Sequence, residues 1–291
     1  MRIDLHTHSD RSDGTMPPRG VVRAAAAVGI DVLGLTDHDT AEGWAEAAET
    51  AEEVGIRLVR GMEISCRHAG RSAHLLAYLP DPTHPPLVHG LDLILEGRDQ
   101  RMPRVVRRLR DLGIAIDEDL VRSIAGEAAA MGRPHIADAL VSLGVVQNRD
   151  KAFERYRSPG RPGYVERYAA DIEEMIGIVR GAGGVPVLAH PWGRTDPSAL
   201  QEDGLARLQD VGLVGIEVDH QDHSPAQRAE LRGIAGELDL VVTGASDVHG
   251  AGKIDHDLGC NTTEPAQLER LLDAAERIAT AAGRRAPGGL P

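Results

Sequence analysis

Aromatic residues make up only 2% of this 291-residue sequence, which contains a single phenylalanine. Hydrophobic residues reach 42%, so the core must be built mainly from Ala, Val, Leu and Ile. The scarcity of aromatic rings argues against a stacking platform for single-stranded nucleic acid. The length suits one large domain, or one domain that carries a modest insertion.

Cysteine is also scarce. The two cysteines, Cys66 and Cys260, form no CxxC pair, so the sequence predicts neither a disulfide framework nor a thiolate zinc site. The sequence lacks a run of about 18 apolar residues, and it lacks an initial cationic segment followed by an apolar stretch, which disfavours a membrane span and secretion. These absences favour a reduced, cytoplasmic setting.

Acidic residues outnumber basic residues by 45 to 32, which gives a formal net charge of −13. Affinity for long polyanions comes from neutralised phosphates, so this charge argues against stable binding to long DNA. It does not exclude a small phosphorylated substrate, because bound cations can invert the local potential where carboxylates converge.

Short apolar runs of strand length alternate with amphipathic helical segments, which is the pattern of parallel β/α units. The predicted strands are 2–5, 32–35, 57–61, 74–79, 185–188, 214–218 and 240–243. The predicted helices are 18–28, 41–54, 171–182, 200–211, 225–238 and 264–282. We therefore predict an α/β fold, a distorted (β/α)7-type barrel.

The block from 97 to 163 breaks this rhythm, because it is rich in arginine, helical in period and without a convincing strand. We interpret it as an inserted helical cap. Residues 1–96 and 164–282 would then form the metal-binding barrel, and residues 283–291 a flexible tail.

Side chains that can bind metals follow the predicted strands one after another. His6 and His8 lie two apart, so both side chains leave the same face of an extended segment. In a parallel barrel the carboxyl ends of the strands converge on one rim, where active sites lie. The residues expected to meet there are His6, His8, Asp13, His38, Glu63, His74, His190, Asp247 and His249.

Such groups buried together without cations would be unfavourable, because they lose solvation and the carboxylates repel one another. They exceed what one tetrahedral zinc ion requires, so we expect two or three divalent ions with a bridging carboxylate. Nitrogen and oxygen ligands without thiolate suit Zn²⁺, Mn²⁺ or Fe²⁺.

Each motif alone has a more ordinary interpretation. A pair of histidines two apart also occurs on exposed strands. In the TDHD segment, Thr36 and Asp39 could cap a helix. The joint occurrence of candidate ligands at successive strand ends is what favours a metal cluster. The histidines without such a position, which we expect on the surface or in loops, are His68, His84, His89 and His256.

At these residues the sequence resembles the polymerase and histidinol phosphatase (PHP) superfamily over nearly the whole chain. The matching elements are His6 with His8, TDHD at 36–39, Glu63, His74, His190, and Asp247 with His249. Further segments resemble the branch that contains nucleoside 3′,5′-bisphosphate phosphatases and the RNase AM exoribonucleases. These segments are GRPHIADAL at 132–140, RPGYV at 161–165 and EVDHQDHS at 217–224.

The resemblance implies three metal sites. They would consist of His6, His8, Glu63 and Asp247; of Glu63, His74 and His190; and of Asp13, His38 and His249. Asp13 replaces a histidine of some relatives, which makes the third site richer in oxygen. The family typically has Tyr or Asn at the position of Asp219, and commonly Lys at that of Arg161.

Residues and resemblance together predict an enzyme that removes the 3′-phosphate of a nucleoside 3′,5′-bisphosphate. The cations would activate water for attack on phosphorus. His220 or His223 would protonate the leaving group. The candidates for clamping a second phosphate are Arg133 and His135 of the cap, Arg161 of its exit loop, and Arg194.

Three alternatives stay open. A 5′-3′ exoribonuclease would use the same centre on short RNA, and a histidinol-phosphate phosphatase would need no second clamp. The third is a noncatalytic metal-binding module, against which the intact set of ligands argues. The expected partner of the enzyme is a small phosphorylated substrate, either a nucleotide or the 5′ end of a short RNA.

Overall fold

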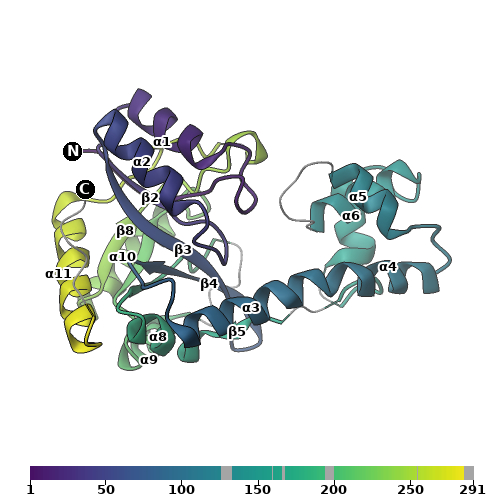
Figure 1. Ribbon diagram of the computed structural model, residues 1–291. Helices are drawn as coiled ribbons and strands as arrows, with labels where there is room; N and C mark the ends of the chain where they lie inside the picture. Colours follow the sequence, from purple (N-terminus) through teal and green to yellow (C-terminus); the bar gives the residue numbers. More distant parts are fainter. Residues whose placement is uncertain (126–132, 159, 166–167, 194–199, 254, 285–291) are drawn as a thin grey trace. The chain divides into compact units, whose positions relative to one another are not determined.

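The computed structural model of the chain (Figure 1) describes all residues except 126–132, 159, 166–167, 194–199, 254 and 285–291. The chain divides into two compact units. The larger unit consists of residues 1–91 and 170–291, and the smaller unit of residues 92–169. No helix in the described part of the chain is long and apolar enough to cross a membrane.

A mixed sheet forms the centre of the larger unit. Its strands are β1 (Ile3–Thr7), β2 (Val32–Leu35), β3 (Arg57–His68), β4 (Arg71–Tyr78), β5 (Ala170–Asp171), β6 (Val185–Leu188), β7 (Gly215–Asp219) and β8 (Val241–Gly244). They follow the order β1-β2-β3-β4-β6-β7-β8, and β5 pairs with β3. Thr7 of β1 bridges Val248 beyond β8, so the two ends of this path meet. The predicted α/β fold with a barrel-like sheet is confirmed.

The sheet is not wholly parallel, which corrects one expectation. β4 runs antiparallel to both β3 and β6. β3 extends seven residues beyond the predicted end at position 61, because Ala69 and Gly70 turn the chain directly into β4. Both turn residues have positive φ, 47° and 77°, as in tight hairpin turns. Glu63 and His74 therefore lie within a β-hairpin, and their predicted positions next to the ends of parallel strands are wrong.

Every predicted helix of the larger unit forms, with ends shifted by at most three residues. These helices are α1 (Pro18–Ala27), α2 (Trp44–Val54), α8 (Ile172–Gly181), α9 (Glu202–Asp210), α10 (Pro225–Glu237) and α11 (Pro265–Ala281). Capping side chains mark the first residues of two of these helices. Asp171 accepts hydrogen bonds from the N–H groups of Glu173 and Glu174 at the start of α8, and Ser224 forms a capping box with Gln227 at the start of α10.

The core of the larger unit is aliphatic, as the composition predicts. Ile3, Leu5 and Val32 from neighbouring strands pack with Val185 and Val187 of β6, and all five are fully buried. Helix α11 covers this cluster with residues at helical spacing, which bury one face of the helix. These α11 residues are Leu268, Leu271, Ala274, Ala275 and Ile278.

Helices are the only regular secondary structure in the described residues of the smaller unit, apart from turns and irregular connections. Helix α3 (Pro85–Asp99) enters it, followed by α4 (Arg101–Asp111), α5 (Glu118–Ala125), α6 (Arg133–Ser142), α7 (Arg149–Ala152) and a π-helical turn (Phe153–Arg157). Its own core joins Val105 and Leu109 of α4 to Val121, Ile136 and Leu140. The predicted insertion, 97–163, falls inside this unit, and its role as a cap stays a prediction. Of the predicted tail, only Gly283 and Arg284 belong to the described residues.

Candidate metal centre

Glu63 lies at the centre of a cluster of histidines. Its side chain is buried in the middle of β3. Carboxylate Oε2 lies 3.2 Å from Nε2 of His6 and 3.2 Å from Nε2 of His8, both carried by the first strand and the residue after it. Nδ1 of His38, from the loop after β2, lies 3.2 Å from the same oxygen. One carboxylate oxygen thus faces three imidazole nitrogens.

The other oxygen of Glu63 faces two more imidazoles. Oε1 lies 2.7 Å from Nδ1 of His74 on β4 and 3.0 Å from Nε2 of His190 after β6. Burial alone would raise the pKa of Glu63, but the surrounding imidazoles, His38 first, hold this pKa well below its usual value. Glu63 is therefore a buried, ionised carboxylate that presents each of its oxygens to a different set of imidazoles.

Asp247 joins the first group of donors. Its Oδ1 lies 3.2 Å from Nε2 of His8 and 3.6 Å from Nε2 of His6. The donor atoms of His6, His8, Glu63 and Asp247 all lie within 4.8 Å of one another, which matches the first implied site. A second group within that distance comprises His38, Glu63 and His74, whereas the resemblance implies His190 in place of His38.

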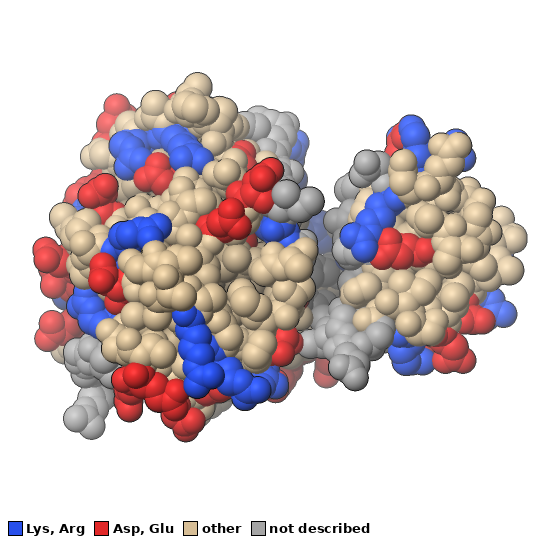
Figure 2. All heavy atoms as spheres, turned by 90° about the horizontal axis from the view of Figure 1, so that it is seen from above, with Lys and Arg blue, Asp and Glu red and all other residues tan. Residues whose placement is uncertain are grey.

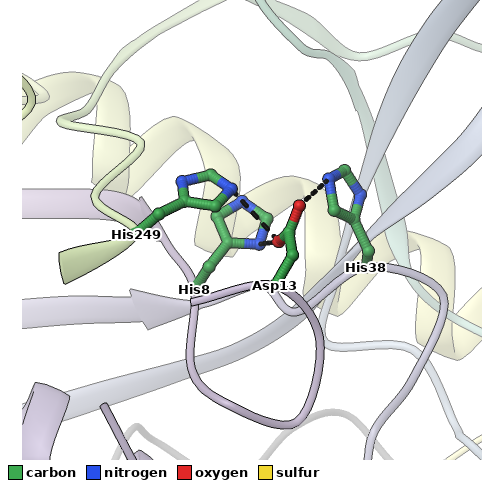
Figure 3. A group of neighbouring side chains, drawn as sticks. All are labelled: His8, Asp13, His38 and His249. Atoms are coloured by element: carbon green, nitrogen blue, oxygen red, sulfur yellow. Dashed lines mark ion pairs between the residues drawn. The ribbon is translucent and has the colours of Figure 1, made fainter. Parts of the chain in front are cut away.

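The third group surrounds Asp13 (Figure 3). Its Oδ1 lies 3.2 Å from Nε2 of His249 and 3.7 Å from Nδ1 of His8, and its Oδ2 lies 3.8 Å from Nε2 of His38. His8 is thus an additional potential ligand beyond the implied set of Asp13, His38 and His249. The structure brings all nine candidate ligands together, and the ions that they hold stay a prediction.

The loop that carries Asp13 is anchored by Asp37. The Asp37 carboxylate accepts hydrogen bonds from the N–H of Ser9 at 2.7 Å, and from the hydroxyls of Ser9 and Ser12 at 2.6 Å each. Asp39 holds β3 in the same way, by accepting from the N–H and the hydroxyl of Ser65. Helix α2 begins only after Gly43 and has no side-chain cap, so the expected capping by Thr36 and Asp39 is wrong.

Three residues of the site have strained backbone conformations. Asp39, His190 and Asp247 have positive φ values of 56°, 26° and 52°. Such values in residues other than glycine are unfavourable by about 1–3 kcal/mol each and concentrate at functional sites. The surrounding hydrogen bonds hold them in place, including one from the N–H of Asp247 to the carbonyl of His6 at 2.9 Å.

Glu217 supports the cluster from β7, a role that the sequence analysis missed. The side chain is completely buried. Its Oε1 lies 3.0 Å from Nδ1 of His6, and its Oε2 accepts a hydrogen bond from the N–H of His190 at 3.0 Å. Because a carboxylate only accepts, Nδ1 of His6 carries the proton and Nε2 is left to face Glu63 and Asp247. Burial raises the pKa of Glu217, but His6 outweighs it and lowers this pKa to about 2.

Glu217→Gln is expected to weaken the binding of divalent cations about 10–100-fold, because outer carboxylates orient ligating imidazoles. Titration of the metal-free protein with Mn²⁺, followed by calorimetry, measures this change. Glu237→Gln, the same chemical change at the exposed end of α10, is the control and should bind as the parent does. Equal affinity of all three proteins would refute the orienting role.

His220 and His223 are both buried, and both ring nitrogens of each are engaged. Nε2 of His220 lies 3.1 Å from Oδ2 of Asp247, and Nδ1 accepts a hydrogen bond from the N–H of Asp222. In His223, Nδ1 donates to the carbonyl of Val218 at 2.8 Å, and Nε2 accepts from the N–H of Trp192 at 3.2 Å. The role of proton donor stays a prediction, and the backbone hydrogen bonds of His223 weigh against it.

Two further residues lie beside this network. His256 is 7% exposed and its ring lies against that of His220, with Nε2 3.7 Å from Oδ1 of Asp222. It lies in a loop, as expected, and is buried there. The ammonium group of Lys253 forms an ion pair with Oδ2 of Asp247. Asp247 therefore turns one oxygen to His6 and His8 and the other to His220 and Lys253.

Of the four candidate residues for binding a second phosphate, the structure describes the side chains of two. Arg194 and the side chain of Arg133 lie outside the described residues. His135 is half-buried on α6, where burial lowers its pKa, and Arg161 is exposed in the loop that follows the π-helical turn. Both belong to the smaller unit, and their roles stay predictions.

Comparison with known proteins assigns the family. Residues 4–104 match the PHP domain. A 3′,5′-nucleoside bisphosphate phosphatase of Chromobacterium violaceum is 37% identical over 258 residues, which cover 88% of this chain and 90% of that relative. The chain belongs to the PHP family. A 5′-3′ exoribonuclease of Haemophilus influenzae is 35% identical over 249 residues, covering 85% of this chain and 90% of that PHP relative.

A solved structure is similar over nearly the whole chain. It is a proposed metal-dependent phosphoesterase of Bifidobacterium adolescentis, with 38% identity and a TM-score of 0.81, and the match covers 93% of this chain and 95% of that one. The predicted membership of the PHP family and the predicted class, a metal-dependent phosphoesterase, are confirmed by these likenesses.

Proposed function

We propose that this chain removes the 3′-phosphate from a nucleoside 3′,5′-bisphosphate, with divalent cations held by the histidine cluster. The position of Glu63 carries the proposal, because its two oxygens lie within 3.2 Å of five histidine nitrogens. The identity of 37% with a 3′,5′-nucleoside bisphosphate phosphatase supports the choice of substrate.

The donors fit two or three divalent ions. Every donor atom is an imidazole nitrogen or a carboxylate oxygen, a set that suits Mn²⁺, Zn²⁺ or Fe²⁺. The proposed ligands are His6, His8, Glu63 and Asp247 for one ion, Glu63, His74 and His190 for another, and Asp13, His38 and His249 for a third. Such ions lower the pKa of water and neutralise charge on phosphoryl oxygens.

The residues of the chain have separate tasks in this proposal. Glu63 would hold metal through both of its oxygens, which face different imidazoles. Glu217 keeps the proton of His6 on Nδ1, so that Nε2 stays available as a ligand. Asp37 holds the loop that presents Asp13. His135 and Arg161 of the smaller unit would bind the 5′-phosphate, together with Arg133 and Arg194.

A 5′-3′ exoribonuclease activity is the second candidate, supported by the identity of 35% with an exoribonuclease. Both reactions use water to break a phosphoester bond, and they differ in the group that leaves. A histidinol-phosphate phosphatase is the lesser alternative, because a substrate with one phosphate gives the proposed clamp no role.

The two candidates are separated by their products. Incubated with Mn²⁺, the protein is expected to release orthophosphate and adenosine 5′-phosphate from adenosine 3′,5′-bisphosphate. The comparison substrate is a 5′-phosphorylated RNA of about five nucleotides, from which an exoribonuclease releases mononucleotides. Mononucleotides from RNA without any orthophosphate from the bisphosphate would reject the first candidate in favour of the second.

A further inference from the structure

The two units differ strongly in charge. Residues 92–169 contain 14 basic and 12 acidic side chains, whereas the rest of the chain contains 18 basic and 33 acidic ones. The larger unit therefore has a formal net charge of −15, and the smaller unit one of +2. An argument from net charge against polyanions applies to the larger unit alone.

Helix α4 concentrates this positive charge on one face. Met102, Val105, Val106 and Leu109 bury the opposite face in the core of the smaller unit. Arg104, Arg107 and Arg110 are exposed and follow one another at intervals of three residues. Residues at this interval form a continuous row on a helix, here about 9 Å long at 1.5 Å per residue. We name these three residues the α4 arginine row.

No side chain in the described part of the chain neutralises the α4 arginine row. Among the described residues, none forms a hydrogen bond or an ion pair with Arg104, Arg107 or Arg110. Several exposed arginines elsewhere are paired, for example Arg23 with Glu53 at 3.1 Å and Arg207 with Glu173 at 2.9 Å. Figure 2 likewise shows basic and acidic side chains interspersed on the visible face of the larger unit. Three like charges left unpaired in one row form a surface that favours a polyanion.

The chemistry of the row favours a phosphodiester chain over a membrane. Helices that lie in a membrane surface expose an apolar face beside their basic face. In α4 the four apolar side chains are buried in the protein core instead, so only the guanidinium groups are left for a ligand. Guanidinium groups bind phosphate oxygens in pairs of hydrogen bonds, which matches successive phosphates of a nucleic acid backbone.

We propose that the α4 arginine row is a binding surface for the backbone of single-stranded RNA, formed by residues that are not candidate metal ligands. This inference rests on the proposed function, because bound RNA is a substrate only if the metal cluster hydrolyses phosphoesters. The scarcity of aromatic residues fits binding through phosphates rather than through stacked bases.

The test compares two triple variants with the same change in charge. Arg104, Arg107 and Arg110 are replaced by Gln in the first, and the paired arginines Arg23, Arg122 and Arg207 in the second. Binding of a fluorescent, non-hydrolysable 2′-O-methyl RNA of ten nucleotides to the metal-loaded protein is measured over a range of salt concentrations. A third variant, with Lys at the three row positions, keeps the charge.

The row variant is expected to lose about 2 units from the slope of log affinity against log salt, at about 0.7 per phosphate contact. Extrapolated from 1 M salt, that slope corresponds to about a hundredfold weaker binding at 0.1 M. The control variant and the Lys variant should keep the slope of the parent. Hydrolysis of adenosine 3′,5′-bisphosphate should be unchanged in all of them.

An unchanged slope of log affinity against log salt in the row variant would overturn the inference. An equal decrease of this slope in the row and control variants would also overturn it. Binding to phosphatidylserine vesicles that depends on the row, without binding to RNA, would overturn it in favour of a membrane. RNA binding that depends on the row in a protein that hydrolyses neither substrate would support the inference and reject the proposed function. Hydrolysis of the bisphosphate without RNA binding would support the proposed function and reject the inference.

Discussion

Glu63→Gln is expected to lower kcat/KM for adenosine 3′,5′-bisphosphate by about 10³-fold or more and to reduce the metal bound per chain. The carboxylate faces five imidazoles, from four different segments, through both oxygens. An amide keeps the shape but has one oxygen and no charge, so it cannot join two cations. Losing several kcal/mol of transition-state stabilisation corresponds to this factor, at about 1.4 kcal/mol per tenfold.

Kinetics of orthophosphate release and elemental analysis of the purified protein measure the two effects. The matched control is Glu53→Gln on α2, where an exposed carboxylate pairs with Arg23. Its kcat/KM and metal content should equal those of the parent. Thermal unfolding of the Glu63 variant shows that any loss occurs in a folded protein. A Glu63 variant with parental turnover would contradict the placement of this carboxylate at the reacting centre.

The sequence was sufficient to predict the candidate ligands that the structure brings together, because most of them follow a recognisable local signal. His6 and His8 share a face of a short strand, and His190 follows the apolar run of β6. The signals for helices were equally local, as the capping box at Ser224 illustrates. Candidate ligands were predicted at one strand end after another. This joint occurrence favoured a metal site, although each motif alone had a more ordinary interpretation.

The hairpin of β3 and β4 escaped prediction for a physical reason. Alternating β/α units led to the expectation of a parallel strand at every step, and the polar residues around Ser65 concealed the continuation of β3. In the structure the two strands form a ladder that runs from the pair Gly61 and Tyr78 to the pair His68 and Arg71. Such pairing depends on contacts across the turn, and a short turn of Ala69 and Gly70 gives a weak local signal.

Glu217 and His256 were missed because their roles depend on distant neighbours. Glu217 is separated by 211 residues from His6, which its carboxylate orients. His256 lies in an irregular loop, and its burial results from contact with His220. A charged residue in the apolar strand β7 was the one available signal for Glu217, because a buried carboxylate needs a partner. No pattern in the sequence indicates the burial of His256.

Removal of the metal ions by a chelator is expected to abolish hydrolysis, and Mn²⁺ is expected to restore it. The metal-free protein should still be folded, because the aliphatic core of the larger unit is built from residues separate from the candidate ligands. Metal binding should stabilise the folded state further. An ion present at a hundred times its dissociation constant adds about 2.7 kcal/mol to the free energy of unfolding.

For a chain of this length, each kcal/mol raises Tm by about 2–4 °C, so one ion should raise it by about 5–10 °C. Scanning calorimetry of the metal-free protein, with and without Mn²⁺, measures the shift. Because ligating imidazoles must be neutral, protons compete with the metal for them, and the shift should shrink as the pH falls. His249→Ala should reduce the shift, since it removes a donor of one site, whereas His89→Ala, an exposed histidine on α3, should not. A Tm that does not respond to Mn²⁺ at neutral pH would mean that the cluster of histidines and carboxylates binds no metal.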